Sequence, residues 1–114
     1  MLTALIVFVA AQHIAFMVLE MFLWEQPLGR KVFGLDEDFA RRPATLAANQ
    51  GLYNGFLAAG LLYGLLLGSE GRHIIVLLLV CIVIAGIFGG LTVSRKIFLV
   101  QTVPALLTLL AMFL

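Results

Sequence analysis

The stretch that decides the fold is residues 44–68, ATLAANQGLYNGFLAAGLLYGLLLG, an apolar run with four polar side chains in its first half. On a helix at 100° per residue, those polar residues share one sector with three glycines, while small residues form a second sector. The polar residues are Asn49, Gln50, Tyr53 and Asn54; the small residues of the second sector include Gly51 and Gly55. The remaining face is apolar and is left for contact with lipid; it contains Leu52, Phe56 and Tyr63. A helix with two close-packing faces and one apolar face is typical of the centre of a membrane bundle.

The composition excludes a soluble domain of ordinary make-up. Of the 114 residues, 63% are hydrophobic and 11% charged, and the mean hydropathy is +1.15, whereas soluble domains have roughly 25% charged residues. A net charge of +1 gives no electrostatic footprint for nucleic acid. Because Cys81 is the only cysteine, one chain can form neither a disulfide nor a thiolate metal site. No cofactor and no metal are therefore expected.

The apolar runs predict an all-α membrane protein, a four-transmembrane-helix up-down bundle that occupies residues 1–114 as a single domain. The expected helices are residues 2–24, 44–68, 72–92 and 97–114, with an interfacial loop at 25–43. Pro27 and Gly29 are expected to stop the first helix, and Pro104 to break or bend the last. Acidic residues ahead of basic ones within the loop favour a short helix at the membrane surface. Glycines expected at helix contacts are Gly51, Gly55, Gly60, Gly64, Gly86 and Gly90.

The distribution of Lys and Arg predicts the orientation. Six basic residues lie in loops 25–43 and 93–96, and one, Arg72, lies in the turn between the second and third helices. Short loops rich in Lys and Arg stay in the cytoplasm. We therefore expect a multi-pass protein of a bacterial cytoplasmic (inner) membrane, with both termini outside and the two basic loops inside.

The polar residues of three helices are expected at one depth. Glu20 lies about one turn from the cytoplasmic end of the first helix, and the polar residues of the other helices lie one to three turns from that boundary. An ionisable residue inside a membrane is costly and marks a candidate functional site. We predict a ligand pocket in the cytoplasmic half, lined by Glu20, Asn49, Gln50, Tyr53, Asn54 and Gln101. His13, seven residues before Glu20, forms with it a candidate proton relay across about 10 Å.

Three functions are consistent with this pattern. The first is binding or transport of a small molecule, coupled to protons at Glu20. The second is a structural or accessory membrane subunit whose polar layer only fixes helix register. The third, weaker one is a lipid-modifying enzyme with Glu20 and His13 as acid and base. Since the chain lacks a nucleophile–His–acid set, a phosphate-binding glycine loop and an HExxH motif, no catalytic residue is assigned.

Two segments carry a resemblance. The run QHIAFMVLEMFLW, followed by a charged loop and then by LAANQGLYNGFLAAGL, resembles an uncharacterised family of small bacterial four-helix membrane proteins, domain of unknown function 1304. The resemblance covers nearly the whole chain, and residues 49–55 are its most specific part. It implies a four-helix fold and a membrane location, and it supplies no activity. From the apolar helices and the polar pocket, the expected partners are the lipid bilayer and a small-molecule ligand. A homo-oligomer is left open.

Overall fold

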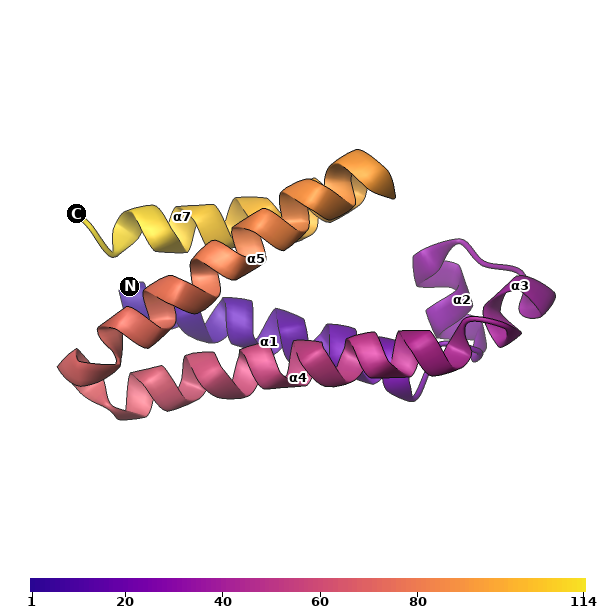
Figure 1. Ribbon diagram of the computed structural model, residues 1–114, viewed down its shortest axis with the longest axis horizontal. Helices are drawn as coiled ribbons and strands as arrows, with labels where there is room; N and C mark the ends of the chain where they lie inside the picture. The colour runs from indigo at the N-terminus through magenta and orange to yellow at the C-terminus, as the bar shows by residue number, and fades with distance from the viewer. The chain divides into compact units, whose positions relative to one another are not determined.

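The computed structural model describes residues 1–114, and all of its regular structure is helical (Figure 1). The α-helices are α1 (Leu2–Met21), α2 (Pro27–Phe33), α3 (Glu37–Arg41), α4 (Ala44–Leu66), α5 (Arg72–Thr92), α6 (Arg95–Ile97) and α7 (Val103–Ala111). A 3₁₀ turn, η1 (Gly68–Gly71), joins α4 to α5, and a π-helical turn, η2 (Phe98–Thr102), joins α6 to α7. The all-α prediction is confirmed.

The helix ends differ from the predicted ones in four places, one of which is the end of the second helix, predicted at residue 68 and found at Leu66. The third predicted helix, 72–92, coincides with α5, but α1 ends at Met21 rather than at residue 24. Pro27 and Gly29 do not stop the first helix, because α1 has already ended at Met21. Both residues lie in α2, which Pro27 begins at a position where the N–H that proline lacks would have no helical partner anyway. The predicted helix 97–114 is interrupted, with η2 directly before the first turn of α7 that contains Pro104. The helical hydrogen-bonding pattern thus changes next to this proline, while the chain stays helical from Phe98 to Ala111.

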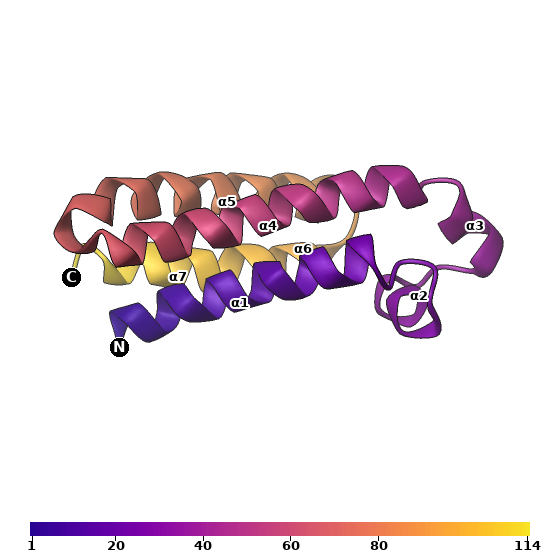
Figure 2. The ribbon, with the colours of Figure 1, turned by 90° about the horizontal axis from the view of Figure 1, so that it is seen from below.

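The chain divides into two compact units, one of Ala11–Ala58 and one of Met1–Ala10 with Ala59–Leu114. In the first unit, the second half of α1 runs antiparallel to the first half of α4 (Figure 2). Small residues allow this approach: a Cβ added at Gly51 would lie 2.7 Å from Met21 Cγ, and one at Gly55 would lie 2.7 Å from Met17 Sδ. The two helices therefore meet at a seam where α4 presents glycine and α1 presents methionine.

The loop of the first unit forms two short helices where the sequence predicted one. Gly34, with φ 66°, ends α2 in the left-handed conformation that glycine adopts without steric cost. Asp36 then caps α3, because its side chain accepts a hydrogen bond from the Phe39 N–H at 2.7 Å. The acidic-then-basic order of 36–42 is therefore confirmed as a capped helix, α3, with basic Arg41 in its last turn.

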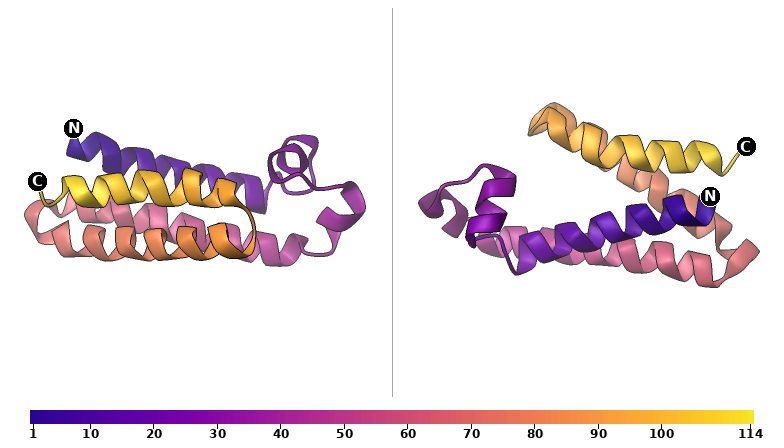
Figure 3. Two further views of the ribbon diagram at one scale, coloured as in Figure 1. Left: turned by 90° about the horizontal axis from the view of Figure 1, so that it is seen from above. Right: turned by 180° about the vertical axis from the view of Figure 1, so that it is seen from behind.

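In the second unit, α5 and α7 pack side by side and antiparallel (Figure 3). Leu79 and Ile82 on α5 and Ala105 on α7 are fully buried. Gly86 faces η2 closely, since a Cβ there would lie 2.9 Å from the Thr102 backbone nitrogen. At the other end of α5, a Cβ on Gly71 would lie 1.9 Å from the Gly64 carbonyl oxygen, so η1 returns directly against the end of α4.

Two segments, Leu2–Met21 and Gly68–Thr92, are long and apolar enough to cross a membrane. α4 has 23 residues, which is also sufficient in length. Its hydropathy is lowered by Asn49, Gln50 and Asn54. Membrane association is therefore indicated by α1 and α5.

Candidate functional site

The buried face of α4 contains one of its four polar residues. The buried positions of α4 within the first unit are Ala47, Gly51, Asn54 and Ala58, at spacings of four, three and four. Asn54 is only 5% exposed. Asn49, Gln50 and Tyr53 are exposed, and Tyr53 packs edge-on against Phe56 at a ring separation of 5.8 Å. The structure therefore assigns Asn54 to the interior of the first unit and turns the other three polar residues outward.

A hydrogen bond connects α1 and α4 at the buried polar position. The Asn54 side-chain Nδ2 donates to Glu20 Oε1 at 2.5 Å, and the Glu20 side chain is half-buried. Glu20 stands in the last turn of α1, and a Cβ added at Gly51 would lie 3.0 Å from its Cβ. Gly51 thus provides the close approach of the two backbones that brings the carboxylate to the amide.

A cavity of about 300 Å³ adjoins this pair, where the chain leaves α1. Its walls are Glu20, Met21, Phe22, Trp24, Glu25, Gln26 and Ala44. The two ionisable groups of the lining, Glu20 and Glu25, are both acidic. Such a wall favours a positively charged group or a group with several N–H donors. We call this cavity, together with Asn54, the Glu20 site.

Trp24 holds one wall of the Glu20 site in place. Its indole Nε1 donates to the Ala40 carbonyl at 2.8 Å, and its ring lies 4.7 Å from the ring of Phe33. One side chain thereby contacts both α2 and α3. The sequence pattern assigned no role in the pocket to Glu25 or Gln26, because these residues belong to no periodic segment.

The predicted proton-relay partner, His13, is fully buried. Its ring packs edge-on against Phe16 at 5.3 Å. Seven residues of helix separate it from Glu20, about 10 Å along the axis. The relay stays a prediction.

Gln101 belongs to the second unit, where it is half-buried within η2. It is not among the residues that line the Glu20 site. No group of three or more His, Cys, Asp or Glu side chains is placed to hold a metal ion. The site that the structure assembles from the predicted residues is therefore Glu20 with Asn54.

These features define a class of protein: a small all-α chain with two helices able to cross a membrane and an acidic cavity at the end of the first. Residues 7–113 match the family described as protein of unknown function, DUF1304, and the chain belongs to that family. It is 35% identical to the uncharacterized protein YpaA of Lactococcus lactis subsp. lactis (strain IL1403) over 107 residues, 92% of this chain and 90% of that protein. No solved structure matches the chain. The resemblance drawn from the sequence is confirmed.

Proposed function

We propose that this chain is a multi-pass membrane protein that binds a small cationic molecule at the Glu20 site and carries it across the membrane. The spanning segments would be α1, α4, α5 and the run from α6 to α7, arranged up and down. α4 would measure about 34 Å, against a hydrocarbon core of about 30 Å. Large apolar side chains at its surface, such as Phe56 and Leu66, are 57% and 85% exposed, as suits lipid contact.

The basic residues supply the proposed orientation, with both termini outside an inner bacterial membrane. Arg30, Lys31, Arg41 and Arg42 lie between α1 and α4, and Arg95 and Lys96 lie in α6, whereas Arg72 stands alone at the start of α5. Cytoplasmic loops carry the excess of Lys and Arg. The Glu20 site would then face the cytoplasmic half of the membrane.

The orientation is tested with single cysteines at Ser69 and Ser94, which are both exposed, in a Cys81→Ser background. We expect an impermeant thiol reagent to label the cysteine at position 69 in intact cells and the one at position 94 only after the cells are opened. Labelling of both positions in intact cells would contradict a single orientation.

The observation that carries the proposed binding function is the Glu20–Asn54 pair beside a polar-walled cavity. If Glu20 only fixed the register of α1 against α4, its hydrogen bond with Asn54 would be sufficient and no adjoining cavity would be needed. Here the carboxylate also borders about 300 Å³ of space, together with Glu25, Gln26 and the ring of Trp24. An amine would satisfy the acidic groups by charge-assisted hydrogen bonds and the indole by a cation–π contact. Protonation and deprotonation of Glu20 would couple transport of the amine to the movement of protons.

Filling the cavity tests this function without changing Glu20. Ala44 lines the Glu20 site and Thr45, its exposed neighbour, does not. In a thermal-shift series with primary and quaternary amines, we expect wild type and Thr45→Phe to be stabilised by the same compounds and Ala44→Phe by none. If no amine separates Ala44→Phe from Thr45→Phe, the cavity binds no such ligand. Constant co-purification of another protein would then favour the accessory-subunit function.

A further inference from the structure

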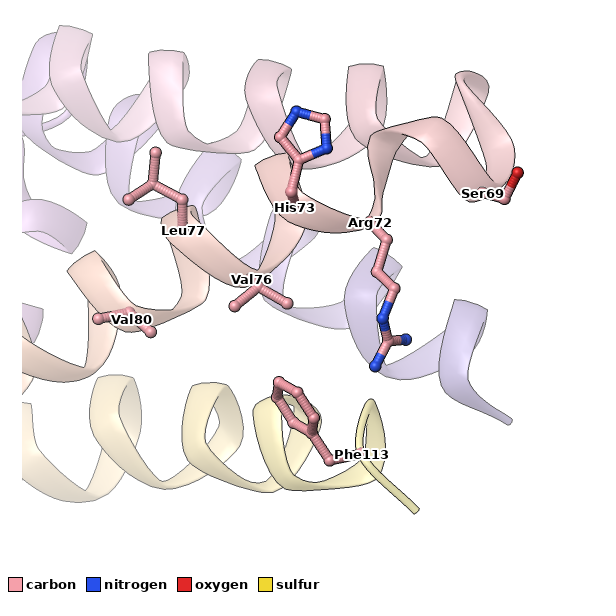
Figure 4. A pocket seen from close by; sticks show the side chains of 7 residues that line it. All are labelled: Ser69, Arg72, His73, Val76, Leu77, Val80 and Phe113. Atoms are coloured by element: carbon pink, nitrogen blue, oxygen red, sulfur yellow. The ribbon is translucent and has the colours of Figure 1, made fainter.

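A second cavity, of about 530 Å³, lies in the second unit, where α5 begins and the chain ends beyond α7. Figure 4 shows its seven lining side chains, six of them from η1 and α5 and one, Phe113, from the segment after α7. They are Ser69, Arg72, His73, Val76, Leu77, Val80 and Phe113. We call this cavity the Arg72 groove. It shares no residue with the Glu20 site.

One end of the Arg72 groove is basic and polar. Arg72 is held there by two contacts: its Nη2 donates to the Met112 carbonyl, and its guanidinium carbon lies 5.2 Å from the centroid of the Phe113 ring. A guanidinium has five N–H donors, so this anchoring leaves donors for an anion. Ser69 and His73 also line the groove, but Figure 4 shows the Arg72 guanidinium on the Phe113 side of α5 and the His73 ring on the opposite side. No acidic side chain is among the lining residues. This end therefore suits a phosphate or a carboxylate.

The rest of the Arg72 groove is apolar. Val76, Leu77 and Val80 continue the face of α5 that begins at Arg72, and Leu77 is 62% exposed. From Arg72 to Val80 the helix rises about 12 Å. An acyl chain could therefore lie along this strip while its headgroup remains at the arginine.

The direction of this strip agrees with the geometry of a bilayer. Arg72 is the first residue of α5, and Val80 lies eight residues into the helix. In a membrane-spanning α5, the arginine would stand at the headgroup level and the valine well inside the hydrocarbon region. A lipid has the same order, with a polar group at the interface and hydrocarbon below it. A free anion would make no use of the apolar strip.

We propose that the Arg72 groove binds one anionic lipid, with its phosphate or carboxylate on Arg72 and an acyl chain along Val76, Leu77 and Val80. This proposal rests on the membrane location of the chain and does not depend on the Glu20 site. It predicts selectivity for headgroup charge, beyond the general contact that every membrane helix makes with lipid.

The test uses the full chain, delipidated in detergent and offered equal amounts of palmitoyl-oleoyl phosphatidylglycerol and phosphatidylcholine. Native mass spectrometry then counts the bound lipids. We expect wild type to retain phosphatidylglycerol over phosphatidylcholine by about tenfold, as befits charge-assisted hydrogen bonds to one headgroup. Arg72→Gln should abolish this preference. The matched control Arg95→Gln, which removes an exposed arginine of α6, should keep it.

Three further arms separate the alternatives. Val80→Trp should weaken lipid retention while it leaves Arg72 in place, and Arg72→Lys should keep part of the preference if Arg72→Gln fails to fold. Glu20→Gln should retain the preference for phosphatidylglycerol. This variant therefore separates a failure of the proposed Glu20 site from a failure of the proposed Arg72 groove. Equal retention of the two lipids by wild type, an Arg95→Gln effect as large as that of Arg72→Gln, or displacement of the lipid by inorganic phosphate alone would overturn the proposal.

Discussion

Glu20→Leu is expected to lower the free energy of unfolding by about 1–3 kcal/mol and to abolish stabilisation by amines. The leucine offers no acceptor to the side-chain amide of Asn54, a residue that is 5% exposed and donates a hydrogen bond to Glu20. A buried donor without a partner loses its hydration without compensation. Unfolding of the purified protein in detergent, followed by circular dichroism with and without the amine, measures both effects.

Glu20→Gln separates the two roles of this side chain. The glutamine oxygen can still accept from Asn54 Nδ2, so we expect a loss of stability below about 1 kcal/mol. The charge, however, is gone, and amine binding should fall as far as it does in Glu20→Leu. Glu70→Gln, at an exposed glutamate that lines neither cavity, is the matched control and should change neither quantity.

A double variant checks the partner assignment. If the cost of Glu20→Leu arises from the orphaned amide, Glu20→Leu with Asn54→Leu should be less destabilised than the sum of the single variants. Additive losses, or a Glu20→Leu protein as stable as wild type that still responds to amines, would show that Glu20 faces lipid or water. The Glu20 site would then have no binding role.

The helix positions follow largely from local chemistry and were therefore predictable. α5 begins and ends as its apolar run does, because Gly68–Gly71 forms a turn before it and Val93–Ser94 leaves the helix after it. The end of α1 was not predictable in the same way. The composition of residues 22–26 does not by itself predict that the helix ends there. The chain turns at this point because the Trp24 side chain forms a hydrogen bond with the Ala40 carbonyl, sixteen residues later. Such a contact leaves no periodic signal.

The candidate site was predictable in part for a related reason. Periodicity gives the angle between residues on one helix, but not which angle faces a neighbour. The projection grouped Asn54 with Gln50 and Tyr53, whereas α1 packs against the small residues Gly51 and Gly55. Asn54 borders both groups and is the one amide that reaches Glu20. Small residues, rather than polar ones, mark the contact face because only they admit another backbone.

Gly71→Ala is expected to be among the most destabilising single substitutions in the second unit, at about 3 kcal/mol. The added Cβ would lie 1.9 Å from the Gly64 carbonyl oxygen and 2.8 Å from the Gly64 Cα. Both are backbone atoms, so neither can rotate away, and η1 must move away from the end of α4. Gly64→Leu should be similarly costly, because its Cβ would already lie 2.6 Å from Ile75 Cγ1 and 3.2 Å from the Gly71 carbonyl oxygen.

Gly60→Ala provides the graded comparison and Leu52→Ala the control. At Gly60 the nearest atom is Leu78 Cδ1, at 2.6 Å, which lies at the end of a flexible side chain and can turn aside, so we expect a smaller loss than at Gly71. Leu52 is 41% exposed on α4, and its truncation should cost least of all. Thermal unfolding of the four variants in one detergent gives the order. A Leu52→Ala protein less stable than Gly71→Ala would mean that α4 and η1 do not approach each other as closely as these backbone contacts require.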